Sequence, residues 1–160
     1  MGLNNIAIGV MTLVGNRLSL ILLLPLCSIP FSIINMLPAF KGNTPDIQHT
    51  VASVFAVILL FLLGLLLGIK SQSYFVRWFS LYWIAGILVF ALGYLTKSFI
   101  ILLPVSFIYF FPLYGLRLFL NIPSDLTLVL LCTLIALAAG LLGYSLGRFR
   151  SKNTPIVQEK

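Results

Sequence analysis

The chain has 160 residues, of which 61% are hydrophobic and 8% are charged. A soluble domain carries about one-quarter charged residues, so this composition excludes a soluble protein. The ten Lys and Arg residues lie one or two at a time at the ends of apolar runs, where such residues orient a membrane protein. The formal charge of +7 therefore does not indicate a nucleic-acid partner.

Each apolar run is close to the roughly 20 residues that cross a bilayer as a helix. We expect one all-helical membrane bundle over residues 1–147, with five or six transmembrane segments, followed by a polar tail over residues 148–160. Residues 1–16 are apolar but short for a span, and this segment decides between five and six.

The first clear span covers residues 18–40, and three prolines interrupt it: Pro25, Pro30 and Pro38. Each proline removes an amide hydrogen bond and presses on the preceding turn, so the helix is expected to kink or break. The carbonyl groups freed in this way need partners in lipid. The span offers three polar side chains for that purpose: Ser28, Ser32 and Asn35.

A polar loop then leads to Thr44-Pro45-Asp46, which predicts the capped first turn of a second span ending near residue 69. Asp46 and His49 are three residues apart and can meet on one helix face. Near the end of the span, Gly64 and Gly68 allow the backbone of a neighbouring helix to approach closely.

A polar link over residues 70–77 precedes a third span, residues 78–95, which begins with an aromatic belt of Trp78, Tyr82 and Trp83. A tight turn leads into a fourth span, residues 98–120, which contains Pro104 and Pro112. A cap at residues 123–125 starts the fifth span, residues 126–147. Small residues on this last span favour helix packing: Ala136, Gly140, Gly143 and Gly147.

Part of the chain is repeated after 79 residues. Residues 19–31 and 98–110 are identical at seven of thirteen positions, and one of these pairs is Pro25 with Pro104. Over residues 19–68, the same offset gives identical residues at 15 of 50 positions. Chance would match about one position in ten in a chain this rich in Leu, Ile and Phe. The sequence therefore predicts two copies, at about residues 18–69 and 97–148, joined by a linking helix over residues 78–95.

Successive spans alternate in direction, and the first span corresponds to the fourth, so the copies are predicted to be inverted. If both proline-broken segments were re-entrant, the copies would instead be parallel. Inverted repeats with broken helices are typical of secondary transporters, which bind substrate near the midplane. The candidate substrate-lining residues are Pro25, Cys27, Ser28, Asn35, Pro104, Ser106, Tyr109 and Tyr114.

Catalytic and coupling chemistry is not apparent in the sequence. No ionisable residue lies in the middle of a span, which argues against an ion or proton pathway. Asp46 and Asp125 stand at helix starts and His49 is the only histidine, so we expect no catalytic residue, metal or cofactor. Arg117 is expected to extend to the membrane interface rather than meet an anionic ligand.

Two functions stay open. One is a transporter or facilitator, or the membrane subunit of a transporter, for a small neutral or weakly polar solute. The other is a non-catalytic accessory, assembly or structural subunit of a membrane complex. In either case we expect a plasma-membrane or inner-membrane protein in contact with lipid, working as a homodimer or with another membrane subunit. If successive spans cross the membrane in alternating directions, the alternating scheme, six of the ten cations lie on the side of the C-terminus. We therefore expect the C-terminus to be cytoplasmic.

Overall fold

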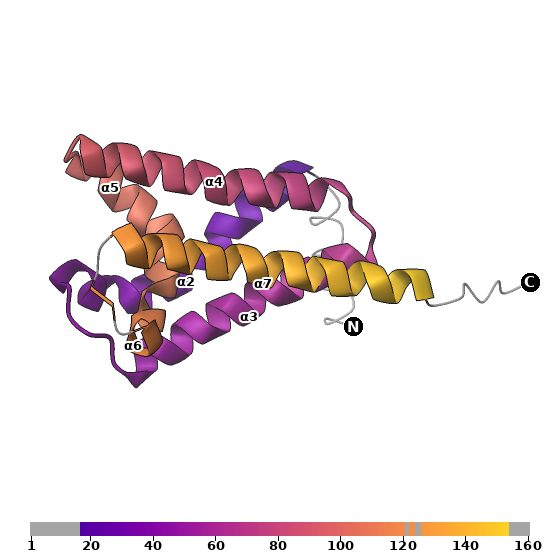
Figure 1. Cartoon of the computed structure of the whole chain (residues 1–160), viewed down its shortest axis with the longest axis horizontal. Coiled ribbons are helices and arrows are strands. Elements are labelled where there is room, and N and C mark those ends of the chain that lie inside the picture. The colour runs from indigo at the N-terminus through magenta and orange to yellow at the C-terminus, as the bar shows by residue number, and fades with distance from the viewer. Residues whose placement is uncertain (1–16, 121, 124–125, 154–160) are drawn as a thin grey trace, which may run out of the picture.

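The computed structural model describes residues 17–120, 122–123 and 126–153, apart from the side chains of residues 17–21 and 152–153. Every regular element within these residues is helical (Figure 1). The elements are α2 (Arg17–Lys41), α3 (Ile47–Ile69), α4 (Tyr74–Leu95), α5 (Phe99–Val105), the π-helix η1 (Ser106–Phe110), the 3-10 helix η2 (Phe111–Leu116), α6 (Arg117–Leu120) and α7 (Leu126–Asn153). The segment 1–16, the residues 124–125 of the predicted fifth cap and the end of the tail lie outside the described residues.

Five helical segments are long and apolar enough to cross a membrane. They are Leu22–Lys41, Ile47–Ile69, Tyr74–Leu95, Phe99–Leu120 and Leu126–Ser151. The predicted all-helical membrane bundle is confirmed at this level. The α2 helix also stays helical across its three prolines rather than breaking at any of them.

Two predicted boundaries differ from the structure. The α4 helix begins at Tyr74, four residues before the predicted start, so Trp83 lies well inside the helix and is only 3% exposed. Trp83 is therefore a core residue and not part of an interfacial belt. At the other end of the chain, α7 continues through the first six residues of the predicted tail. Its last turns contain Arg148 and Arg150, and cations favour the C-terminal end of a helix.

The start of α3 depends on Asp46. Its side chain accepts hydrogen bonds from the backbone amides of Gln48 (3.0 Å) and His49 (3.1 Å), which makes Asp46 itself the N-cap. Thr44 and Pro45 precede the cap rather than forming it. The His49 ring also contacts the Asp46 carboxylate, as the spacing of three residues predicted. The backbone amide of His49, more than any other group, lowers the pKa of this carboxylate from its usual value.

The α3 and α7 helices form the tightest pair in the bundle. A methyl group added at Gly64 would overlap the carbonyl oxygen of Gly140, and one at Gly68 would overlap that of Tyr144. In return, methyl groups at Gly143 and Gly147 would overlap the carbonyl oxygens of residues 61 and 65. The two backbones are therefore in direct contact, which is possible only because these positions lack side chains.

The contacts between α3 and α7 are symmetric under an offset of 79 residues, which is also the offset between the two sequence copies. Gly64 packs against residues 140 and 144, while its counterpart Gly143 packs against residues 61 and 65. Residue numbers rise together along both helices at the contact, so α3 and α7 run in the same direction (Figure 1). The inverted arrangement, which would place these two helices in opposite directions, is not confirmed.

The α3 and α7 helices run in the same direction because residues 99–120 bend back instead of running the length of the bundle. Gly93, close to the end of α4, packs against Ile101 and Leu102, and the midhelix Gly86 packs against Tyr109. The chain then returns, because Gly115 reaches the backbone of His49 in the first turn of α3. Both ends of the segment therefore lie at the end of the bundle that holds the α2–α3 loop (Figure 1). Below, residues 99–120 are called the bent segment.

A buried polar cluster around the bent segment

The bent segment turns at the point where its helix is irregular. Residues 106–110 form a π-turn and residues 111–116 a 3-10 turn, and Pro112 has no amide hydrogen to contribute to either. Irregular turns of this kind leave backbone groups without regular helical partners. Residues 110–116 are all buried, so these groups must find partners within the protein.

The α2 helix supplies the first partners through two side chains that are fully buried. The Ser32 hydroxyl donates a hydrogen bond to the carbonyl oxygen of Phe107. The Asn35 amide nitrogen lies 3.4 Å from the carbonyl oxygen of Pro112 and 3.1 Å from the Ser53 hydroxyl. Both side chains therefore hold the backbone of the turn against α2.

The α3 helix supplies the next partners. The Ser53 hydroxyl accepts a hydrogen bond of 2.9 Å from the Gly115 amide, and the Thr50 hydroxyl donates one of 3.1 Å to the Gly115 carbonyl oxygen. Gly115 itself is required here, because a methyl group at this position would overlap the carbonyl group of His49. The turn is therefore held from two sides by four short polar side chains: Ser32, Asn35, Thr50 and Ser53.

At the rim of the bundle, Arg117 closes the cluster. Its guanidinium donates hydrogen bonds to the carbonyl oxygens of Gly42 (2.7 Å) and Ile122 (2.9 Å) and to the Tyr114 hydroxyl (2.7 Å). The same hydroxyl donates a bond of 2.8 Å to the Asn43 carbonyl oxygen. Arg117 is only partly exposed and joins two loops to the bent segment.

The candidate lining residues are not gathered around one cavity. Pro104 is exposed, Pro25 is half-buried, and the Tyr109 ring packs on Gly86 with its centroid 4.6 Å from that of Tyr82. Ser106 belongs to the π-turn and Tyr114 is buried beneath Arg117. Neither Pro25 nor Pro104 lines the small cavity described next.

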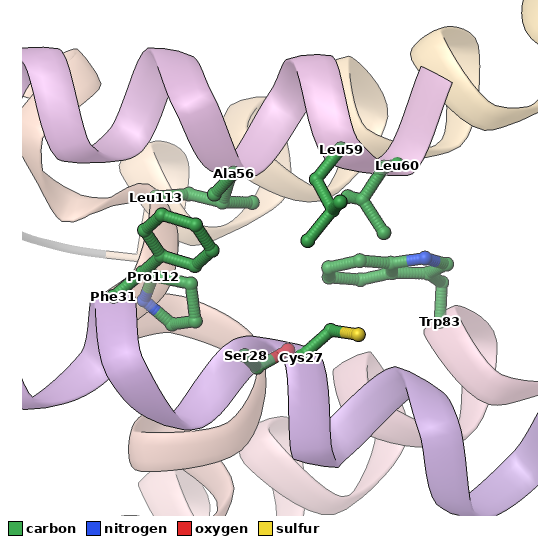
Figure 2. A pocket seen from close by; sticks show the side chains of 9 residues that line it. All are labelled: Cys27, Ser28, Phe31, Ala56, Leu59, Leu60, Trp83, Pro112 and Leu113. Carbon is green, nitrogen blue, oxygen red and sulfur yellow. The ribbon is translucent and has the colours of Figure 1, made fainter. Parts of the chain in front are cut away.

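Two of the candidates, Cys27 and Ser28, do line a small cavity of about 20 Å³ between α2, α3, α4 and η2. Figure 2 shows the rings of Phe31 and Trp83 closing it from two sides, with Pro112 beside Phe31. A cavity of this size holds about one water molecule. It is too small for a solute.

Three buried polar atoms in the described part of the chain have no hydrogen-bond partner: Asn35 Oδ1, the Tyr82 hydroxyl and Trp83 Nε1. They lie on α2 and α4. Within the described residues, His, Cys, Asp and Glu side chains do not form a group of three or more that could hold a metal ion.

Thr50 and Ser53 belong to the cluster but are not among the site residues predicted from the sequence. A signal for them exists, since they are polar, lie three residues apart and occur early in an otherwise apolar run. Their role depends on Gly115, which is 62 residues further along the chain from Ser53, and single-sequence spacing does not relate positions so far apart.

The fold is that of an integral membrane protein, with apolar side chains exposed along all five long segments. The chain matches no protein-family model, no curated protein and no solved structure.

Proposed function

We propose that the protein is a non-catalytic accessory or structural subunit of a membrane complex. One observation carries this proposal: the four short polar side chains around the turn are engaged with the backbone of the bent segment or with each other. Ser32, Asn35, Thr50 and Ser53 all bond to residues 107–115 or to each other. The cavity beside them has room for about one water molecule.

The physical argument follows from the membrane. Irregular backbone at membrane depth is tolerated where it is buried in protein or where it lines a water-filled cavity. A water-lined turn would favour transport, whereas residues 110–116 are buried. A solute would have to displace hydrogen bonds that each contribute about 1 kcal/mol and would leave buried backbone groups unpaired.

The course of the bent segment supports a topology of four crossings and one re-entrant segment. In this topology six cations of the described residues share the end of the bundle where α7 ends: Arg17, Lys70, Arg77, Arg148, Arg150 and Lys152. Three lie at the opposite end: Lys41, Lys97 and Arg117. Six against three is a stronger bias than the six against four of the alternating scheme, and it favours a cytoplasmic C-terminus.

An accessory subunit should be found in a larger particle. We expect the tagged chain, extracted in a mild detergent from the membranes that naturally contain it, to migrate in native electrophoresis well above the purified chain in the same detergent. The control for self-association is the purified chain, whose migration is recorded both without cross-linking, as a monomer, and after cross-linking. Identical migration of the two preparations would contradict the proposal.

The second candidate is a facilitator for a small neutral solute. The observation in its favour is the set of three unpartnered buried atoms on α2 and α4, which a solute could satisfy if α4 moved away from the bent segment. We expect proteoliposomes with the wild-type chain to show background flux across a broad panel of neutral solutes. Flux above background that disappears in a Pro25→Ala, Pro104→Ala double variant would establish transport instead.

A further inference from the structure

Four exposed cations gather at one end of the bundle. Lys70, Arg77, Arg148 and Arg150 lie at the end where α3 and α7 finish and α4 begins, and all four side chains are exposed. The described residues include one carboxylate, that of Asp46, and it caps the start of α3 at the opposite end. The four cations are called the basic end.

Contacts among α3, α4 and α7 assemble the basic end. Gly68 packs against the backbone of Tyr144 and Arg148, so the last turn of α3 lies beside α7 at the level of Arg148. The Phe75 ring of α4 stacks on Tyr144 with a centroid distance of 5.4 Å. Three helices therefore present cations at the same level, and α7 extends past the others (Figure 1).

Arg77 distinguishes this surface from an ordinary set of helix-end charges. Lys70, Arg148 and Arg150 stand at helix C-termini, where the helix dipole favours a cation. Arg77 lies in the first turn of α4, where the dipole disfavours one. The first turn of α4, all of which the structure describes, contains no acidic side chain that could offset this repulsion. A negative group from outside the chain would offset it.

We propose that the basic end binds the phosphate groups of anionic phospholipids. The cations flank apolar spans, so they lie at the depth of the headgroups, and clusters of four or more basic residues at this depth attract anionic lipid. Arginine also binds phosphate through paired hydrogen bonds, which suits Arg77, Arg148 and Arg150. The occupant is a membrane lipid because the surface adjoins the bilayer directly.

The test uses the full-length chain in nanodiscs of phosphatidylcholine with increasing amounts of phosphatidylglycerol. We expect phosphatidylglycerol to raise the unfolding temperature of the wild type, and 1 M salt to remove the increase. In an Arg77→Gln, Arg148→Gln variant, the amount of phosphatidylglycerol needed for half of the increase should rise by about fivefold for each residue replaced. The matched control, Lys41→Gln with Lys97→Gln, removes two exposed cations at the opposite end and should keep the wild-type response.

The single variant Arg77→Gln separates lipid binding from a structural role. In pure phosphatidylcholine its unfolding temperature should equal or exceed that of the wild type, because an unfavourable charge is gone. In phosphatidylglycerol it should fall below the wild type. The same change in both lipids, or equal responses of the two double variants, would overturn the proposal. Inorganic phosphate that reproduces the full increase in phosphatidylcholine would also overturn it, by identifying a site for free anions.

Discussion

Replacing Gly64 by alanine is expected to lower the free energy of unfolding by about 1–3 kcal/mol. The added methyl group would overlap the carbonyl oxygen of Gly140, which is a backbone atom and cannot rotate away. The α3 and α7 helices would have to separate along a contact that continues through Gly68 and Gly147. The loss can be measured as a lower midpoint of thermal or denaturant unfolding in detergent.

The matched control is Gly93→Ala. A methyl group there would lie 3.0 Å from an Ile101 methyl and 3.1 Å from Leu102 side-chain atoms, which can shift. This variant should stay within about 0.5 kcal/mol of the wild type, since alanine also has the higher helix propensity. Equal losses for the two variants would contradict the close α3–α7 contact. Gly143→Ala should behave as Gly64→Ala does, because the two glycines occupy equivalent places.

Replacing Ser53 by alanine is expected to cost about 1–3 kcal/mol of stability. Its hydroxyl accepts hydrogen bonds from the Gly115 amide and from the Asn35 side chain, and both donors would remain buried without that acceptor. Water cannot replace it readily, because Ser53 and Asn35 are both fully buried. Unfolding midpoints measured in the same detergent test this expectation.

Ser145→Ala is the control for Ser53→Ala. The Ser145 hydroxyl is exposed and donates to the Leu141 carbonyl oxygen of its own helix, so its loss should be nearly neutral. An Asn35→Leu, Ser53→Ala double variant should lose less than the sum of the single variants, because the two side chains share one hydrogen bond. Full additivity would indicate that the two side chains act independently.

Local patterns predicted much of the fold. Apolar runs of about the right length predicted the five long segments, and the spacing of Asp46 and His49 predicted their contact. These predictions depend only on residues within one or two turns of each other. The glycines of α3 and α7 were recognisable for the same reason, although the partner that each one contacts was not.

Local sequence patterns could not predict the direction of the second copy relative to the first. An apolar stretch of about 22 residues has the same composition whether it crosses the bilayer or bends within it, and the prolines of α2 do not break that helix. The difference lies in side chains far away in the sequence, because Ser32, Thr50 and Ser53 bond to the irregular backbone at residues 107–115. The alternation of spans along the sequence therefore gives no sign of the bend in residues 99–120, on which the relative direction of α3 and α7 depends.

The most direct test of the account asks on which side of the membrane the bent segment ends. In a chain with Cys27→Ala and Cys132→Ala, single cysteines would replace three exposed residues: Ser71, Lys97 and Pro123. Each would be treated in sealed vesicles with a membrane-impermeant maleimide from one side at a time. The account predicts that Lys97→Cys and Pro123→Cys react from the same side and Ser71→Cys from the other. Reaction of Pro123→Cys from the side of Ser71→Cys would contradict it, because the bent segment would then cross the membrane.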